Sequence, residues 1–444
     1  MSLRTPESVW NLQKALAAKA KGSPTFRFYS LYDKICRRDV LGWAYRRCKA
    51  NGGSPGADGQ TFEQIEAEGL GGWLDGLMEE LQQKRYKPGA VKRVWIPKAD
   101  GKKRPLGVPR IRDRVVQMAA VLVLEPIFEE DFPEEQYGYR PERSAHDALR
   151  AIHRWVNEGH GEVVDADLSG YFDTIPHHDL MKSVARRVSD GAMLKLIREW
   201  LEMAVEETDE QGTKRRTTVN KDTGRGTPQG APISPLLANL YMRRFILGWK
   251  KQGWEQRFEA RIVNYADDFV ILCRHEAREA REQMQRIMTG LKLTVNEKKT
   301  TVCRVPGESF DFLGYTIGQQ HSARGGKSYI GTRPSRKRIQ RFCEAISLMT
   351  ARTTLNAPTE TLIHDLNLKL KGWANYFCLG AVSKAYRAVD SHARFRLRQW
   401  LRRKHKRSGA GTKTYSDEYL YERLGLVRLE VRTKHLPWAK AAQV

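Results

Sequence analysis

Long apolar runs are absent from this sequence of 444 residues. The longest candidate for a membrane span, residues 115–124, is interrupted by Gln117 and is half the length of the ~20 residues that a spanning helix needs. The N-terminus lacks the apolar core of a signal peptide. Neither an internal repeat of fixed period nor a low-complexity tract is present. These absences argue against a membrane-spanning or repeat architecture, so we expect a soluble protein with no membrane partner.

Cysteine is scarce and unpaired. The chain has 6 cysteines, which are scattered and form no C-x-x-C pair: Cys36, Cys48, Cys273, Cys303, Cys343 and Cys378. Zinc sites and the disulfide frameworks of secreted domains depend on paired or regularly spaced cysteines. We therefore expect neither a zinc centre nor disulfides, and the reducing cytoplasm fits this composition.

Acidic residues are outnumbered by basic ones. The chain has 77 Lys and Arg against 52 Asp and Glu, which gives a formal charge of +25 and an isoelectric point near 9.8. Residues 331–444 alone hold 24 Lys and Arg against 8 Asp and Glu, a net charge of +16. This excess indicates a polyanionic partner, with nucleic acid as the first candidate. Its concentration near the C-terminus indicates a separate binding unit, and the length is typical of about two to four domains.

Residues 261–272, RIVNYADDFVIL, place two adjacent carboxylates between two apolar runs. Apolar runs separated by a short polar break are typical of a β-hairpin, so Asp267 and Asp268 are predicted at its tip. Neighbouring carboxylates at a buried turn repel each other unless a divalent cation neutralises them. The alternative interpretation is a solvated Asp-Asp turn without a ligand.

Another carboxylate ends the strand predicted within residues 162–173, EVVDADLSGYFD. Alternation places apolar residues on one face of this strand and Asp167 on the other, and the following glycine ends the strand. Asp167 is then either a cap for the next helix or a third ligand for a cation at Asp267 and Asp268.

A basic hairpin is predicted at residues 90–109. Its Asp-Gly pair lies between two extended runs, with Lys98 and Arg104 beside the tip. The segment is either a solvated basic turn or a clamp on phosphates, for which Lys supplies a point charge and Arg a fork of donors.

A rigid loop is predicted at residues 226–235, GTPQGAPISP. Three prolines and two glycines fix the backbone ahead of an apolar helix. Gln229 would lie just before that helix and could contact a substrate.

A basic amphipathic helix is predicted at residues 386–404. Its apolar stripe consists of Tyr386, Val389, Ala393, Leu397 and Trp400, and its basic face of Arg387, Arg394, Arg398 and Arg402. This face either follows a phosphate backbone or is simply solvated.

These motifs, in this order, resemble the reverse transcriptases encoded by bacterial group II introns, which also act as maturases. The resemblance covers about residues 30–405. Its motifs are IPK at 96–98, RPLG at 104–107, Asp167 with FD at 172–173, TPQG at 227–230, YADD at 265–268, FLGY at 312–315 and LN at 366–367 with GWANYF at 372–377.

The resemblance implies an α+β right-hand polymerase, with fingers, a palm built on an antiparallel sheet, and a helical thumb. We expect an N-terminal extension at 1–40, fingers at 41–160, a palm with the active site at 161–325, and a basic thumb or maturase (X) region at 326–444 that could include a DNA-binding tail. Some members carry an HNH endonuclease, but no cysteine pairs with His and Asn are present for one, so we expect none.

The resemblance also implies roles for individual residues. Asp167 and Asp267 would bind two Mg²⁺ ions, for which Mn²⁺ could substitute, with support from Asp268 and the backbone carbonyl of Leu168. The incoming nucleotide would contact Lys98 and Arg104 at its triphosphate, Phe172 as a steric gate under the sugar, and Gln229. Nucleic acid would contact Phe312, Leu313 and Gly314 as a primer grip, and Arg336, Lys337, Arg387, Arg394, Arg398 and Arg402 on basic helices.

The implied function is RNA-directed DNA synthesis by two-metal catalysis, together with assistance to splicing and mobility of a group II intron. Its partners would be an RNA template with a DNA primer, dNTPs, intron RNA and target DNA, in the bacterial cytoplasm and on the nucleoid when bound to DNA. One alternative is a host-adopted or defence-associated reverse transcriptase without an intron partner. Another is an RNA-binding splicing cofactor with a vestigial polymerase, against which the intact polymerase motifs argue.

Overall fold

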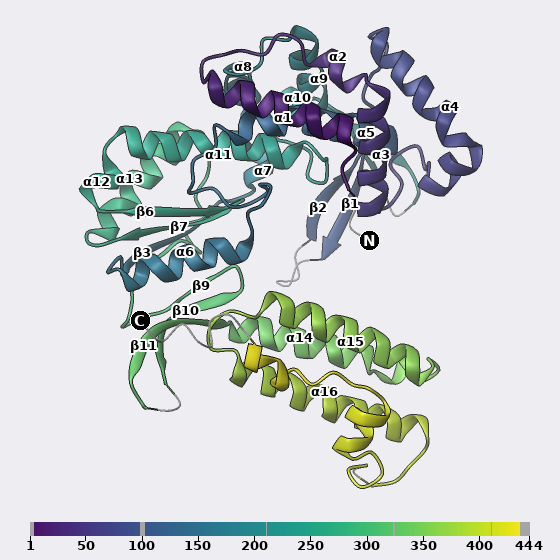
Figure 1. Ribbon diagram of the computed structural model, residues 1–444, viewed down its shortest axis with the longest axis vertical. Coiled ribbons are helices and arrows are strands. Elements are labelled where there is room, and N and C mark those ends of the chain that lie inside the picture. Colours follow the sequence, from purple (N-terminus) through teal and green to yellow (C-terminus); the bar gives the residue numbers. More distant parts are fainter. Residues whose placement is uncertain (1–3, 98–102, 210, 323–324, 410, 436–444) are drawn as a thin grey trace. The chain divides into compact units, whose positions relative to one another are not determined.

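The computed structural model describes residues 4–97, 103–209, 211–322, 325–409 and 411–435 (Figure 1). Its chain divides into two compact units. Unit 1 comprises Met1–Ser144, Ala166–Ile271 and Glu276–Thr301, and unit 2 comprises Ala145–Asp165, Leu272–His275 and Val302–Val444. None of the described helices combines the length and apolar character that crossing a membrane requires.

Helices make up most of unit 1. They are α1 (Glu7–Gly22), α2 (Tyr32–Ile35), α3 (Arg38–Asn51), α4 (Phe62–Gln82), α5 (Ile111–Glu129), α7 (Tyr171–Thr174), α8 (His177–Ala185), α9 (Gly191–Leu201), α10 (Val219–Thr223), α11 (Ser234–Lys251), α12 (Trp254–Arg257) and α13 (Ala277–Gly290). Helix α5 carries the apolar run at 115–124, and every residue of that run is buried. Because α5 is covered by α1 and α3, this run forms part of the core of unit 1 (Figure 1).

The basic hairpin predicted at 90–109 is confirmed. Strands β1 (Val91–Pro97) and β2 (Lys103–Val108) pair antiparallel, with Ile96 opposite Arg104. They belong to a four-stranded sheet in the order β2-β1-β4-β5, in which β4 (Val205–Thr208) runs parallel to β1 and antiparallel to β5 (Lys214–Thr217). The hairpin tip, including Lys98, lies outside the described residues.

A second four-stranded sheet carries the predicted carboxylates. Its order is β6-β7-β3-β8, formed by β6 (Arg261–Tyr265), β7 (Asp268–Cys273), β3 (Glu162–Asp167) and β8 (Thr301–Arg304). The central strands β7 and β3 are the apolar runs identified in the sequence, and most of their residues are buried. Both strands contribute residues to both units.

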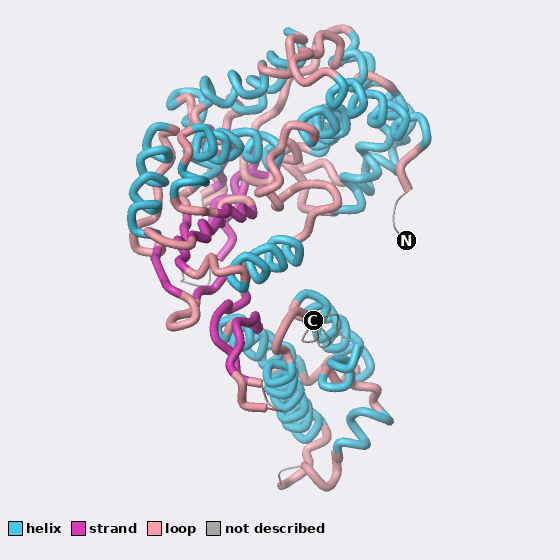
Figure 2. The backbone as a smooth tube through the Cα atoms, turned by 60° about the vertical axis from the view of Figure 1, so that its left-hand side comes forward, coloured by secondary structure: helices cyan, strands magenta, loops and turns pink. Residues whose placement is uncertain are grey.

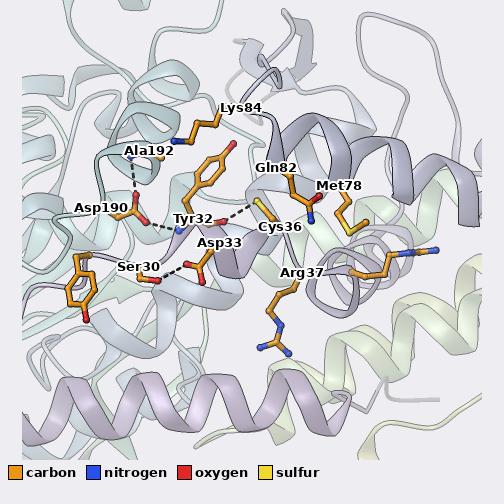
Figure 3. Close-up of a pocket in the computed structure, with 12 residues that line it drawn as sticks. Ser30, Tyr32, Asp33, Cys36, Arg37, Met78, Gln82, Lys84, Asp190 and Ala192 are labelled. Atoms are coloured by element: carbon orange, nitrogen blue, oxygen red, sulfur yellow. Dashed lines mark hydrogen bonds between the residues drawn. The ribbon is translucent and has the colours of Figure 1, made fainter.

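The segment before α3 is packed into unit 1 rather than free. The carboxylate of Asp190 accepts hydrogen bonds of 2.8 Å from the backbone N–H groups of Leu31 and Tyr32, and it caps α9 through the N–H of Ala192 (Figure 3). A pocket of about 600 Å³ opens beside this carboxylate, and Figure 3 shows the side chains that line it. One buried carboxylate thus joins the N-terminal residues to α9.

Unit 2 combines a helix, a sheet and a helical bundle. It contains α6 (Ala145–Asn157), β9 (Phe310–Phe312), β10 (Tyr315–His321), β11 (Ser328–Pro334), α14 (Arg336–Met349), α15 (Thr359–Tyr376), α16 (Ser383–Lys404) and the short turns η1 (Arg352–Thr354), η2 (Tyr419–Arg423) and η3 (Glu430–His435). Helix α14 packs against both α15 and α16 (Figures 1 and 2). The apolar stripe predicted on α16 is buried, from Tyr386 to Trp400, which confirms that interpretation.

Candidate active site

The carboxylate pair lies on a tight hairpin in unit 1. Strands β6 and β7 are joined by Ala266 and Asp267, and Asp268 is the first residue of β7. Ala266 adopts a positive φ of 59°, a left-handed conformation that costs a residue with a Cβ roughly 1–2 kcal/mol. The predicted hairpin is therefore present, and its turn is strained.

Asp167 ends β3 and already has a cationic partner. Its carboxylate accepts hydrogen bonds from the amide of Asn296 at 3.0 Å and from the ammonium group of Lys299 at 3.1 Å. The N-cap residue of the following helix, α7, is Gly170, and no side chain caps that helix. Asp167 is thus not a helix cap, and its charge is balanced by Lys299, a partner that we did not predict.

The chemistry of these side chains suits a divalent cation, because Mg²⁺ prefers carboxylate and carbonyl oxygens. The carboxylate of Asp267 also acts on the side chain of Tyr139. Burial raises the pKa of the Tyr139 phenol, and the negative charge of Asp267 raises it further. Within the described residues, however, no three or more His, Cys, Asp or Glu side chains are gathered closely enough to hold a metal ion.

A pocket of about 820 Å³ lies in unit 1 beside these elements. One wall is the face of β1 and β2 that carries Val94, Ile96 and Arg104, and the others include Tyr139, Phe172 and Gln229, together with the loops at 51–54 and 229–235. The structure thus brings three of the predicted nucleotide-binding residues, Arg104, Phe172 and Gln229, into one cavity.

Gln229 is held from both sides. Its carbonyl oxygen accepts a hydrogen bond of 2.9 Å from Nε of Arg104, and its amide nitrogen donates one of 2.9 Å to Asp173. Since the amide is engaged at both ends, its orientation in the pocket is fixed.

The loop that carries Gln229 is seated directly on β2. The N–H of Gly107 donates to the carbonyl of Gln229 at 2.6 Å. Gly230 has a φ of 107°, and a Cβ there would lie 2.6 Å from the carbonyl oxygen of Gly107. Only glycine permits both the positive φ and this close approach, so the glycine after Gln229 holds the loop against the strand.

Phe172 lies at the inner wall of the pocket and is 6% exposed. Its ring meets the ring of Tyr139 edge-on, with centroids 6.3 Å apart. We did not predict Tyr139 as a residue of the site. Tyr139 has a positive φ of 56°, its side chain is 48% exposed, and it lines the pocket.

The predicted primer grip belongs to unit 2. Phe312 is buried in β9, and Leu313 and Gly314 form the turn into β10 with φ values of 48° and 85°. The hydroxyl of Tyr376, at the end of α15, donates to the carbonyl of Leu313 at 2.8 Å. The turn is therefore attached to the helical bundle of the same unit.

The basic residues of unit 2 lie in two different settings. Arg336 and Lys337 on α14 and Arg387 on α16 are exposed. Arg394 and Arg398 instead form ion pairs with Asp417, which follows α16 in the chain, and Arg402 donates to the carbonyl of Gly409. The far end of the basic face is thus partly covered by the chain's own C-terminal residues.

Two known domains match this chain. Residues 96–317, half of the chain, match the family described as reverse transcriptase (RNA-dependent DNA polymerase). Residues 339–419 match the maturase-specific domain of group II introns. Reverse transcriptases generally use divalent metal ions, in keeping with the carboxylates described above.

Individual proteins are also similar in sequence to this chain. Protein YkfC of Escherichia coli strain K12 is 33% identical over 363 residues, which cover 73% of this chain and 92% of YkfC. The group II intron-encoded protein LtrA of Lactococcus lactis subsp. cremoris is 32% identical over 286 residues, or 62% of this chain. The aligned part spans only 43% of LtrA.

Among solved structures, a partial Cas6-RT-Cas1–Cas2 complex aligns with 59% of this chain and 41% of its own, at 24% identity and a TM-score of 0.35. The domain matches confirm the predicted α+β right-hand polymerase fold and the predicted family. The chain therefore belongs to the group II intron-encoded reverse transcriptase/maturase family, whose enzymatic class is RNA-directed DNA polymerase.

Proposed function

We propose that this protein synthesises DNA on an RNA template by two-metal catalysis and assists splicing and mobility of a group II intron. The observation that carries the catalytic part is the pocket in unit 1. It combines a cationic group, an aromatic wall and a fixed amide (Arg104, Phe172 and Gln229), and the carboxylate of Asp267 acts electrostatically on its Tyr139 wall.

Two Mg²⁺ ions would be held by Asp167, Asp267 and Asp268, with the backbone carbonyl of Leu168. When bound, such ions supply activation of the primer 3′ hydroxyl and stabilisation of the leaving pyrophosphate. The ammonium group of Lys299 at Asp167 supports this assignment, because it shows that the end of β3 accommodates positive charge.

The protein's own side chains position the nucleotide. Arg104, with Lys98 from the same hairpin, would bind the triphosphate oxygens of a dNTP, since guanidinium groups match phosphate geometry. The ring of Phe172 would leave no room for a 2′ hydroxyl and so exclude ribonucleotides. Gln229, fixed between Arg104 and Asp173, would keep the guanidinium aimed at the pocket.

Nucleic acid would contact unit 2. The turn at Leu313 and Gly314, with Phe312, would grip the primer, and the exposed Arg336, Lys337 and Arg387 would bind the backbone of intron RNA or of the template-primer duplex. The match to a maturase-specific domain at 339–419 supports an intron RNA partner. Fingers at 41–160, palm at 161–325, thumb at 326–444 and target DNA as a further partner remain part of this proposal.

Primer extension tests the catalytic part. Purified protein is given poly(A) RNA, oligo(dT), dTTP and Mg²⁺, beside the variant Asp267→Ala, Asp268→Ala. Extension by the wild type alone is the expected result. Activity in the double variant would refute the carboxylate assignment, and inactivity of both with RNA binding retained would favour a splicing cofactor with a vestigial polymerase.

Splicing is measured separately on a precursor RNA that contains the intron. The double Asp variant is expected to splice as the wild type does, because the maturase-specific domain lies outside the catalytic strands. Loss of splicing in that variant would contradict separable functions. Intron RNA domains flanking the gene distinguish an intron-encoded enzyme from a host-adopted or defence-associated one.

A further inference from the structure

The catalytic turn is supported from inside by one buried amide. Asn264, in β6, has no exposed surface. Its side-chain nitrogen donates hydrogen bonds to the carbonyl of Ala266 at 2.8 Å and to the carbonyl of Asp268 at 3.3 Å. These two carbonyls lie on either side of Asp267, so a single amide group spans the turn between the strands.

The same residue is fixed by its backbone. The N–H of Asn264 donates to Glu135, and its carbonyl accepts from the N–H of Tyr137, each at 2.8 Å. These bonds form the bridge between β6 and the segment at 135–137, and they fix the backbone from which the amide side chain extends. Its side-chain oxygen finds no hydrogen-bond partner among the described residues, so donation to the turn is the role that its contacts show.

The backbone of the turn also packs closely against Gly138. A Cβ on Gly138 would lie 2.4 Å from the backbone nitrogen of Ala266, so only glycine fits there. The amide of Asn239 in turn donates to the carbonyl of Gly138 at 2.8 Å. Ala266 keeps its unfavourable φ of 59° between these two supports, and strained backbone persists where the surroundings over-determine it.

We propose that Asn264 is the positioning residue of the carboxylate pair: by fixing the carbonyls before and after the side chain of Asp267, it sets the direction in which Asp267 and Asp268 present their oxygens to divalent cations. This inference rests on the proposed catalytic function. An amide suits the task because its two N–H groups can serve two carbonyls, whereas a carboxylate at this position could donate to neither.

The test replaces Asn264 with Ala and measures cation binding as well as activity. Mn²⁺ binding to the protein without nucleic acid is followed by electron paramagnetic resonance, and the Mg²⁺ concentration for half-maximal primer extension is measured in parallel. We expect Asn264→Ala to weaken Mn²⁺ binding and raise the Mg²⁺ requirement at least fivefold, with the KM for dTTP changed less than twofold. Values of both cation measurements within twofold of wild type would overturn the proposal.

A structural role is separated from a positioning role by a second substitution. Glycine adopts a positive φ without the cost that Ala266 bears. The double variant Asn264→Ala, Ala266→Gly is therefore expected to recover the wild-type melting temperature but not the wild-type cation affinity. Recovery of both together would show that the amide only stabilises the hairpin and would also overturn the proposal.

Tyr386→Phe is the matched control. The hydroxyl of Tyr386 is likewise a buried donor near two backbone carbonyls, those of Ala374 at 2.9 Å and Phe377 at 3.0 Å, but it lies in unit 2. Its loss should lower the melting temperature and leave the Mg²⁺ requirement unchanged. If the wild type binds Mn²⁺ but extends no primer, the proposed polymerase function has failed, and the Mn²⁺ comparison still decides the role of Asn264.

Discussion

Arg104 donates a hydrogen bond of 2.9 Å from its Nε to the side-chain carbonyl of Gln229, which joins strand β2 to the loop that opens α11. In the proposed function, the two terminal nitrogens of this guanidinium would bind phosphate oxygens. Gln229 also donates to Asp173, so the amide stands between a cation and an anion. The two segments therefore form one wall of the pocket in unit 1.

Gln229→Ala is expected to weaken nucleotide binding, because Arg104 loses the partner that orients it. Hydrogen bonds to charged groups are worth about 1.5–3 kcal/mol, so the KM for dTTP should rise about tenfold or more, with a smaller change in kcat. Steady-state primer extension measures both. Gln229→Met, which keeps the volume without the amide, should behave alike; a wild-type KM in both variants would contradict the role.

Phe172→Val is expected to relax the choice of sugar. The buried ring fills the inner wall beside Tyr139, and a smaller side chain leaves space for a 2′ hydroxyl. Steric discrimination of this kind is worth about 1–3 kcal/mol, so the preference for dTTP over rUTP should fall roughly 10- to 200-fold. Incorporation of each nucleotide on poly(A) measures this ratio. Tyr139→Phe keeps the ring contact and should retain the wild-type preference.

The covered end of α16 gives a prediction for RNA binding. Asp417→Asn frees Arg394 and Arg398 from their ion pairs, so affinity for RNA should increase and its salt dependence should steepen. Replacing Arg394, Arg398 and Arg402 with Gln should weaken binding and flatten that dependence. Filter binding at several salt concentrations measures the slopes, and equal slopes in all three proteins would show that this end of α16 does not contact RNA.

The same ion pairs predict a pH effect. Burial would raise the pKa of Asp417, but the guanidinium groups of Arg394 and Arg398 outweigh it and lower the pKa below its ordinary value. A carboxyl with a lowered folded-state pKa contributes stability above its unfolded pKa of about 3.9, and this contribution is lost as the pH falls through the lower folded value. The acid unfolding limb should therefore be less steep in Asp417→Asn, as followed by circular dichroism.

Arg187 provides a stability prediction for unit 1. Its side chain is fully buried, pairs with Asp131 at 3.3 Å and donates to the carbonyls of Ala20 and Ser23 at the end of α1. Breaking a buried ion pair costs about 3–5 kcal/mol, so Arg187→Met should lower the melting temperature by about 10 °C. Arg186, which contacts the same Asp131 from a more exposed position, is the control, and Arg186→Gln should change the melting temperature little.

Local patterns predicted the elements that depend on neighbouring residues. The hairpin at 261–272, the strands on either side of residues 98–102 and the apolar stripe of α16 each follow from alternation, turn residues or helical spacing within a short window. The basic face of α16 was predicted from the same helical spacing. The pairing of this face with Asp417 was not predicted, because the periodicity of a helix does not indicate which later segment will cover it.

The roles of Tyr139 and Lys299 depend on contacts between distant segments. Tyr139 lines the pocket, and its neighbour Gly138 packs against Ala266, 128 positions further along the chain. Lys299 reaches Asp167 because the turn at 296–300 lies beside the end of β3. Such contacts are set by tertiary packing, and the sequence predicted the carboxylates without predicting these partners.

The interleaving of the two units limits how the protein can be dissected. Unit 2 takes α6 from the first half of the chain, and β3 and β7 each contribute residues to both units. A fragment that begins at residue 302 lacks α6, and one that ends at residue 301 lacks most of β8. During translation unit 1 is complete only once residue 301 has been synthesised, at which point unit 2 has α6 but lacks everything from Val302 onward. Neither fragment keeps unit 2 or the β6-β7-β3-β8 sheet whole, so point substitutions are the appropriate means of separating DNA synthesis from RNA binding.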